Sequence, residues 1–421
     1  MLTFSGLGRQ LHGAAAGGSM AEPRGRAAPT PIDRWCLASV ARALGGVPVE
    51  LRLWDDSSAV VANPPVATVT IRDRRTLWGL AARPEVAFGE AYRAGRLDVA
   101  GDLVALLVAI DRKVDWRRVR PASVFTRARL GGDPSVARRN VHHHYDLGNA
   151  FYRLWLDEQL VYTCAYFPTE YTGLDEAQRA KMDYVCRKAD IRPGDVVYEA
   201  GCGWGALALH AARHHGARVR AWNLSAEQVT HARERARAEG LDDRVEFVLD
   251  DYRRIDGHCD VFLSIGMLEH VGPRHYAELG AVMDRCLDPA HGRGVLHFIG
   301  RNTAAPFSAW VRKRIFPGAH APTLREAISG ALEPYAFSVL DVENLRLHYA
   351  RTLEHWLARF EASSDAVARM FDDRFVRMWR LYLAGSQASF ATGCLQLFQV
   401  TFARGAFNDL RWTRAGLYGA E

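Results

Sequence analysis

The chain has 421 residues, more than one hydrophobic core usually holds, so the sequence predicts at least two domains. It is 48% hydrophobic and 24% charged, as in soluble globular proteins, and no stretch is apolar for long enough to be a transmembrane helix. The net charge of +6 favours an acidic partner, either lipid head groups or nucleic acid. The seven irregularly spaced cysteines contain no C-x-x-C pair, which argues against a zinc site or a disulfide framework and for a reducing cytosol.

Residues 1–31 are rich in Gly, Ala, Pro and Arg and lack the continuous apolar region of a signal peptide. We interpret them as a disordered tail, within which Met20 is an alternative start of the chain.

Residues 32–111 are expected to form a small N-terminal α+β domain. A helix over 33–44, capped by Asp33, opens it, and the residues at 47–75 alternate in the manner of strands. The segment 84–110 returns to a helical pattern interrupted by glycines. The domain contains no cluster of Cys, His or acidic residues, so its expected role is lipid binding or assembly.

Residues 112–140 form a predicted basic linker. Over 112–139, nine arginines and lysines stand against two aspartates, with Trp116, Phe125 and Leu130 among them. A solvated connector is one interpretation, because charge runs are usually solvated. A second is contact with an anionic membrane surface, to which basic residues are attracted and into which apolar residues insert. Nucleic acid is a third, but no recognition motif supports it.

The second domain is expected over 141–415 and begins with a segment, 142–157, that has a helical pattern. Its three adjacent histidines, 142–144, would point in different directions on a helix and could not easily converge on one metal ion. No metal site is therefore expected.

The central motif of this domain is the glycine turn VVYEAGCGWG at 196–205. A buried strand ends there and an apolar helix begins at Leu207, and glycines in such a turn let a ligand approach the backbone closely. Further strands alternate with helices, which predicts a doubly wound parallel sheet with its ligand beyond the carboxyl ends of the strands. These strands are expected at 218–224, 245–249, 259–267 and 294–299.

The glycine turn also narrows the class of ligand. Its pattern is E-x-G-x-G-x-G, and no Lys-Ser/Thr pair follows, so it is not a phosphate-binding P-loop. An acid before a turn without a phosphate anchor suits a ligand with a cationic end, such as S-adenosylmethionine. Glu199 could bond the amino group of its methionine part, or it could serve only as a partner of the helix dipole.

Seven motifs now occur in one order along the chain: VYTCAYF, AGCGWGAL, NLSAEQ, GMLEHVG, LHFIG, RIFPGA and HYART. With them the chain resembles the cyclopropane fatty acid synthases over about 30–415, including FGEAYRAGRLDVAGDL in the front domain. The mycolic acid cyclopropane synthases share the catalytic half but lack that front domain, so the phospholipid branch is favoured. The resemblance implies a class I methyltransferase (Rossmann-like) domain with a helical lipid-binding cover.

The resemblance also implies a set of cofactor-binding residues. Tyr162 and Thr163 would lie against the methionine end, the glycine turn would wrap the cofactor, and Tyr252 would lie at the adenine. Ser225 and Gln228 would meet the ribose, although S-x-x-Q could equally be a capping box. The full set is Tyr162, Thr163, Glu199, Gly201, Cys202, Gly203, Trp204, Gly205, Asn223, Leu224, Ser225, Gln228 and Tyr252.

In this family a bound bicarbonate ion takes part in the reaction, and its residues carry over as Cys164, Glu269, His297, Ile299 (through its backbone) and Tyr349. Cys164 is expected to contact the ion rather than to act as a nucleophile, since no adjacent base is evident. Taken singly, each of these residues has a structural interpretation: buried cysteine, satisfied core histidine or packing tyrosine. Their occurrence together within ordered motifs favours catalysis.

The sequence departs from the family at Ser386, where family members often have a cysteine. The bicarbonate mechanism needs no thiol there, so we expect serine to be tolerated. Apolar residues that follow the last expected strand are candidates for an acyl pocket, and the late segments 353–361 and 366–402 are expected to be helical. These pocket candidates are Phe298, Phe307, Trp310, Ile315 and Phe316.

The predicted activity is cyclopropanation of cis-unsaturated acyl chains in membrane phospholipids. The methyl carbon comes from S-adenosylmethionine, and bicarbonate deprotonates the resulting carbocation. The expected location is the cytoplasm, peripherally on the inner face of the membrane, with a homodimer plausible and nucleic acid excluded as a partner. Two alternatives stay open: formation of methyl- or methylene-branched chains on the same scaffold, and a non-catalytic lipid-binding protein.

Overall fold

A computed structural model describes residues 28–113, 147–305 and 307–418. Most of the predicted tail, the basic linker from residue 114 and the three histidines at 142–144 lie outside these residues. No helix in the described part of the chain is long and apolar enough to cross a membrane.

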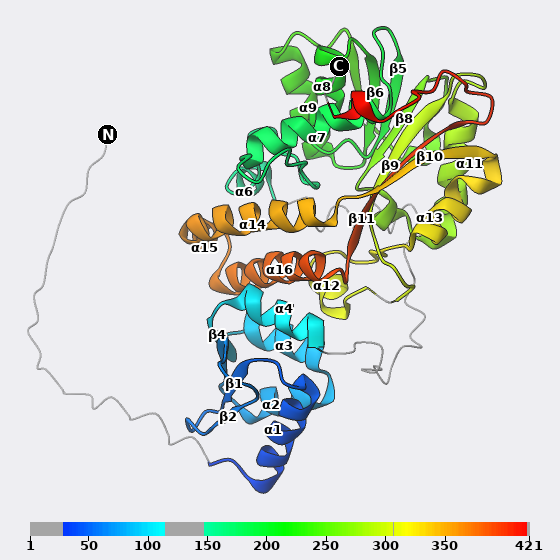
Figure 1. Cartoon of the computed structure of the whole chain (residues 1–421). Coiled ribbons are helices and arrows are strands. Elements are labelled where there is room, and N and C mark those ends of the chain that lie inside the picture. Colours follow the sequence, from blue (N-terminus) through cyan, green and yellow to red (C-terminus); the bar gives the residue numbers. More distant parts are fainter. Residues whose placement is uncertain (1–27, 114–146, 306, 419–421) are drawn as a thin grey trace, which may run out of the picture.

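The N-terminal part, residues 31–113, contains a four-stranded sheet in the order β2-β1-β3-β4 with four helices (Figure 1). We call it the front unit. In chain order its elements are α1 (Pro31–Leu44), β1 (Val49–Arg52), β2 (Ser58–Val60), β3 (Ala67–Ile71), α2 (Arg74–Ala82), α3 (Pro84–Arg93), β4 (Leu97–Gly101) and α4 (Leu103–Lys113).

Two sequence expectations for the front unit were wrong. The helical pattern over 84–110 is two helices separated by β4, which pairs with β3. The N-cap of α1 is Thr30, and Asp33 is the reciprocal member of a capping box, accepting the N–H of Thr30 at 2.8 Å. Both errors are local. A short strand between two helices is hard to tell from a continuous helix in the sequence, and Thr30 and Asp33 are both common capping residues.

The C-terminal part is built on a seven-stranded sheet in the order β10-β11-β9-β8-β5-β6-β7. Its elements are α6 (Asn149–Tyr152), α7 (Leu174–Lys188), β5 (Val196–Ala200), α8 (Ala206–His214), β6 (Arg218–Asn223), α9 (Ala226–Ala238), β7 (Val245–Leu249), β8 (Val261–Ile265), α10 (Leu268–Val271), α11 (Tyr276–Cys286), β9 (Arg293–Gly300), α12 (Ala309–Arg314), α13 (Leu324–Ala331), β10 (Phe337–Asn344), α14 (Arg346–Ala362), α15 (Ser364–Met370), α16 (Asp373–Thr392) and β11 (Gln396–Arg404).

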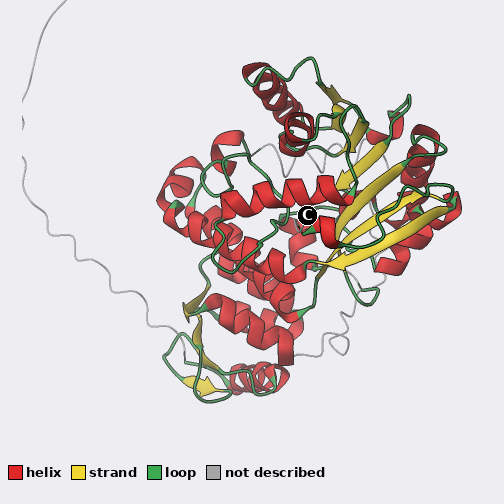
Figure 2. Ribbon diagram, turned by 45° about the horizontal axis from the view of Figure 1, so that its top comes forward, coloured by secondary structure: helices red, strands yellow, loops and turns green. Residues whose placement is uncertain are grey.

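The five strands expected from the sequence are parallel, and helices cover both faces of the sheet, which confirms the doubly wound class (Figure 2). One apolar core lies between the sheet and α7, α8 and α9, and another between the sheet and α11 and α13. The sheet also gains two antiparallel strands, β10 and β11. The helical expectation over 366–402 was wrong beyond Thr392, because β11 is buried on both faces and its apolar run has no strand period.

Helices α14 and α16 form a layer between this sheet and the front unit (Figure 1). A single apolar core runs from the front-unit strands to Trp356 and Trp379 of this layer. Where α3 meets α12 the fit is close, because a Cβ on Gly89 would lie 2.4 Å from the indole of Trp310. Arg314 on α12 also pairs with Glu90 on α3 at 2.6 Å.

Candidate active site

The glycine turn connects β5 to α8 along a path that side chains would block. Gly201 and Gly205 have φ of +84° and +83°, a region that residues with a Cβ rarely adopt. A Cβ on Gly205 would lie 2.5 Å from the ring of Phe247, so α8 could not approach the sheet as it does. The N–H groups of Gly201 and Cys202 both donate to the carbonyl of Trp222, which holds the turn against the end of β6.

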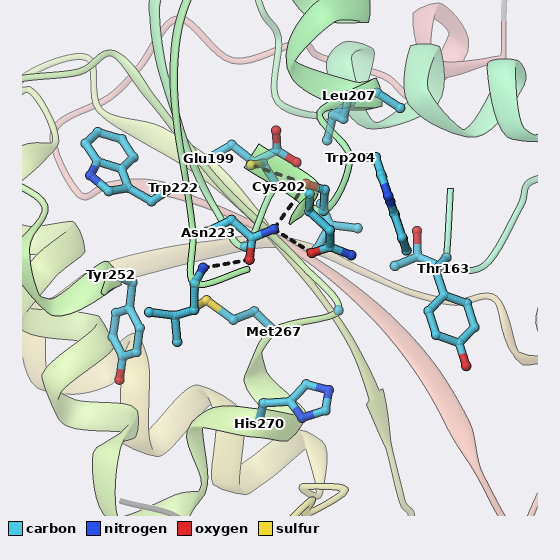
Figure 3. Close-up of a pocket in the computed structure, with 18 of the residues that line it drawn as sticks. Thr163, Glu199, Cys202, Trp204, Leu207, Trp222, Asn223, Tyr252, Met267 and His270 are labelled. Carbon is cyan, nitrogen blue, oxygen red and sulfur yellow. Dashed lines mark hydrogen bonds between the residues drawn. The ribbon is translucent and has the colours of Figure 1, made fainter. Parts of the chain in front are cut away.

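A cavity opens at this turn, beyond the carboxyl ends of the parallel strands (Figure 3). The segment 160–163 and the turn at Pro317 and Gly318 close its other sides. The cavity is lined by most of the residues expected to bind the cofactor, namely Tyr162, Thr163, Glu199, Gly201, Cys202, Gly203, Trp204, Asn223, Leu224, Gln228 and Tyr252.

The two remaining expected cofactor residues, Gly205 and Ser225, support the cavity without lining it. Gly205 is the N-cap of α8, and Ser225 is buried and caps α9 by accepting the N–H of Gln228 at 3.4 Å. In place of the return bond of a capping box, Gln228 Oε1 accepts a hydrogen bond from Asn223 Nδ2 at 2.7 Å. The other side-chain atom, Gln228 Nε2, is buried and has no hydrogen-bond partner within the protein. Gln228 keeps a free donor facing the cavity.

Glu199 is fully buried at the end of β5, and its Oε2 has no hydrogen-bond partner. Burial raises the pKa of its carboxyl to about 7, although the nearby Lys181 and the N–H of Ala208 act in the opposite direction. An unpaired carboxylate oxygen and the unpaired Gln228 Nε2 fit a ligand with an ammonium group at one end and hydroxyls in the middle. These donor and acceptor types fit S-adenosylmethionine.

The sequence did not lead us to Lys181, Trp222, Met267 and His270, all of which line the cavity. Lys181 on α7 donates from Nζ to Thr163 Oγ1 at 3.1 Å, and burial lowers its pKa to about 8. Lys181 is one of the buried residues of α7. Because lysines are almost never fully buried, a lysine on the apolar face of a predicted helix could have pointed to a functional site.

The five residues expected at the bicarbonate do not line the cavity, although Cys164 and Glu269 are next in sequence to Thr163 and His270, which do. Glu269 on α10 directly precedes His270, and its Oε1 accepts the N–H of Ile299 on β9 at 2.5 Å. Cys164 follows Thr163, and its thiol contacts the carbonyl of Leu345 at 3.9 Å, at the start of the helix that carries Tyr349. One hydrogen bond therefore joins Glu269 to Ile299. The Cys164 thiol contacts Leu345, the residue just before the helix that carries Tyr349.

His297 is buried in β9, and its tautomer follows from a chain of contacts. The ammonium of Lys188 can only donate, and it donates to Gln399 Oε1 at 2.9 Å. The amide nitrogen of Gln399 must then face His297 Nδ1, which lies 2.9 Å away, so Nδ1 accepts. The imidazole proton is therefore on Nε2, which is buried without a protein partner.

Two unpaired polar atoms thus remain in this buried region, Glu269 Oε2 and His297 Nε2. Burial raises the pKa of Glu269 to about 7, with the Ile299 N–H opposing it, and holds the pKa of His297 well below its usual value. Burial also raises the pKa of Cys164, which keeps it a thiol. A protonatable carboxyl and a neutral imidazole N–H suit a small oxyanion better than a metal ion.

The apolar candidates for an acyl pocket separate in space. Phe298 packs against Phe398 in the core with α11 and α13, on the opposite face of β9 from His297, so it does not belong to the pocket. Trp310 packs at the interface with α3. Phe316 is best placed, because its ring lies 5.6 Å from His270 and 5.7 Å from Tyr382.

Residues 133–400 match the family model described as mycolic acid cyclopropane synthetase. The chain belongs to this family. It therefore has the S-adenosylmethionine-dependent methyltransferase fold expected from its sequence. Residues 37–116 match a second model, described as a domain of unknown function.

Relatives differ in the reactions their names describe. A probable fatty acid methyltransferase from Pseudomonas putida is 34% identical over 400 residues, covering 91% of this chain and 100% of that protein. Tuberculostearic acid methyltransferase UfaA1 from Mycobacterium tuberculosis is 35% identical, covering 91% and 93%. A cyclopropane-fatty-acyl-phospholipid synthase from Escherichia coli is 40% identical over 272 residues, which cover 64% of this chain and 69% of that protein.

A solved structure agrees with this family assignment. The mycolic acid cyclopropane synthase CmaA1, in complex with SAH and CTAB, matches with a TM-score of 0.60 and 29% identity. The match covers 98% of that chain and 63% of this one.

Proposed function

We propose that this protein transfers the methyl carbon of S-adenosylmethionine to the cis double bond of unsaturated acyl chains in membrane phospholipids and closes a cyclopropane ring. When bound, S-adenosylmethionine supplies an electrophilic sulfonium methyl that even an alkene can attack. Attack leaves positive charge on the neighbouring acyl carbon, and loss of a proton from the new methyl group closes the ring. The protein must hold that charge, exclude water and provide for the proton.

The observation that carries this proposal is the pair of unpaired, buried atoms Glu269 Oε2 and His297 Nε2. Buried polar atoms normally have partners, so these two, at positions where the family resemblance expects an ion, favour a ligand there. With its pKa near 7, Glu269 can donate a proton to an oxyanion, and His297 can donate from Nε2. Bicarbonate fits these donors, and when bound there it would supply the base for the final deprotonation.

The remaining roles belong to residues around the cavity. Glu199 Oε2 and Gln228 Nε2 have no partner within the protein, and they would hold the ammonium of the methionine part and the ribose, respectively. Phe316 and Tyr382, the latter on α16, form a wall beside Tyr162, which lines the cavity and shares a hydrogen bond of 2.8 Å with Tyr382. This wall places an alkene near the methyl donor and keeps water away.

The proposed substrate implies work at a membrane surface. The basic linker would attract anionic lipid on the inner face of the membrane, and its aromatic residues would insert there. This role rests on the composition of residues 112–140, most of which lie outside the described residues. A homodimer stays a prediction.

A second candidate reaction forms a branched chain through the same cation. Direct loss of the proton on the methylated carbon gives a methyl-branched alkene, and a 1,2-hydride shift followed by loss of a proton from the new methyl group gives a methylene branch. It is favoured by the two relatives that match 91% of this chain, whose names describe fatty acid methyltransferases. Both candidates need the same cofactor cavity and the same acyl wall.

Mass spectrometry of lipids from a host expressing the protein tests both candidates, because a ring and a branch fragment differently. The first proposal expects phospholipid acyl chains that are heavier by one CH₂ and carry a ring at the former double bond. A branched product would replace it with the second candidate. Cofactor binding with no new lipid would instead indicate a non-catalytic lipid-binding protein.

A further inference from the structure

A group of metal-binding side chains lies on the outer side of the catalytic domain, away from the cavity. Cys186 is on α7, which packs against α8 (Figure 1). His210 is in the middle of α8, and His215 is the C-cap residue of that helix. One donor atom from each of the three lies within 4.8 Å of the others. Donors around a single zinc ion lie about 3.5 Å apart, since Zn–S and Zn–N bonds are about 2.3 and 2.0 Å. Small side-chain rotations would close the difference.

The hydrogen bonding of the two histidines leaves room for a ligand. His210 Nε2 is buried without a hydrogen-bond partner, which is unusual for a ring nitrogen in this position. His215 Nε2 lies 3.1 Å from Asp183 Oδ1, and His210 Nε2 lies 3.9 Å from the same oxygen. Asp183 therefore places a negative charge beside the cluster, as carboxylates next to zinc-bound histidines do.

The chemistry of the donors favours zinc over harder ions. A thiol and two imidazoles are typical zinc ligands, whereas magnesium and calcium prefer oxygen. Burial and the neighbouring histidines lower the pKa of His210 to about 4, so its ring is neutral with a lone pair available at neutral pH. Burial raises the pKa of Cys186, and a metal would have to displace its proton.

We propose that Cys186, His210 and His215 bind one zinc ion, with Asp183 beside it. The site would join α7 to α8. Helix α7 carries Lys181, and α8 follows Gly205 of the glycine turn. The ion would therefore stabilise two elements that form the cofactor cavity without entering the cavity itself. The irregular cysteine spacing hid this site, since its ligands come from two helices.

Cobalt titration of the full-length, tag-free protein tests the proposal. Tetrahedral Co²⁺ bound by a thiolate gives a charge-transfer band in the near ultraviolet, and zinc should abolish the band by displacing cobalt. Cys186→Ser should lose the band, and His215→Gln should weaken cobalt binding at least about tenfold. Cys394→Ser, at an exposed thiol, and replacement of the histidines at 142–144 by Gln should leave the band unchanged.

Thermal unfolding with zinc and with a chelator gives a second, independent measurement. The wild-type protein should melt at a higher temperature with zinc, and His210→Gln and His215→Gln should lose this difference while remaining folded with the chelator. These two variants decide the matter if Cys186→Ser fails to fold. Absence of the cobalt band in the wild type, or its persistence in Cys186→Ser, would overturn the proposal.

Discussion

The side-chain amide of Gln399 lies 2.9 Å from Nδ1 of His297, and Lys188 fixes the orientation of that amide from its other end. Lys188 is held in turn by Glu343 on β10. We call Lys188 and Gln399 the relay. They lie on α7 and β11, outside the cavity, and together they determine which nitrogen of His297 carries the proton.

Replacing Gln399 by Glu should reverse the tautomer of His297. A carboxylate accepts a hydrogen bond from Nδ1–H, so the ring proton moves from Nε2 to Nδ1 and Nε2 can no longer donate to an oxyanion. Turnover should fall at least about tenfold, as expected for losing one hydrogen bond to a charged group. The ¹⁵N shifts of the His297 ring should change accordingly, with cofactor affinity kept.

Gln396→Glu is the matched control, because Gln396 is buried on the same strand but bonds Asn344 and Gly393 instead. It should leave the His297 shifts in place. A Q399E protein with unchanged shifts and turnover would show that the relay does not govern His297.

Glu269→Gln should keep cofactor affinity and lose most turnover, roughly a hundredfold or more, as for loss of an acid–base group. The amide can still accept from the Ile299 N–H but can no longer give or take a proton. Isothermal titration with S-adenosylmethionine and an assay of product formation separate the two effects. Glu354→Gln, at an exposed carboxylate, is the control. Unchanged activity would rule out the proposed oxyanion site.

Cofactor binding should strengthen as pH rises through the pKa of Glu199. The ionised form binds an ammonium, and burial has raised this pKa from 4.5 to about 7. Between pH 6 and 7.5 the ionised fraction grows, and the dissociation constant should fall about five- to tenfold. Fluorescence titration at several pH values measures it. Glu199→Gln should bind weakly with a flat profile, and a wild-type profile that is also flat would contradict this role.

Ser386 lies partly buried on α16, and its replacement should matter little. We expect Ser386→Ala and Ser386→Cys to turn over within about twofold of the wild type, since the proposed chemistry uses no thiol there. The product assay measures both variants side by side. A large gain with cysteine alone would mean that a thiol takes part.

Replacing Arg117, Arg118 and Arg120 by Ser should weaken binding to anionic phospholipid vesicles, and more strongly at low salt than at high salt. Vesicle sedimentation at two ionic strengths measures this. Replacing Arg237, Arg411 and Arg414 by Ser is the control, because it removes the same charge from exposed positions outside the linker. Vesicle affinity that does not change would leave the linker as a simple connector.

The cofactor cavity could be predicted from the sequence because the residues that form it belong to short local motifs. Glycines with positive φ and polar residues at strand ends fix the position of Glu199 and Asn223 whatever surrounds them. The relay to His297 was not accessible in this way. Gln399 lies on a strand whose apolar run resembles a buried helix, and Lys188 resembles any last-turn lysine of a helix. Only the pairing of β11 with β9 brings them together.

The close packing of Gly89 on α3 against Trp310 on α12 connects the front unit to the candidate active site. Helix α12 leads directly into Phe316 and the turn at Pro317 and Gly318 that closes the cavity. A displacement of α3 would be transmitted through this helix to the turn that closes the cavity. The position of the front unit and the shape of the cofactor cavity therefore depend on one another through a single short helix.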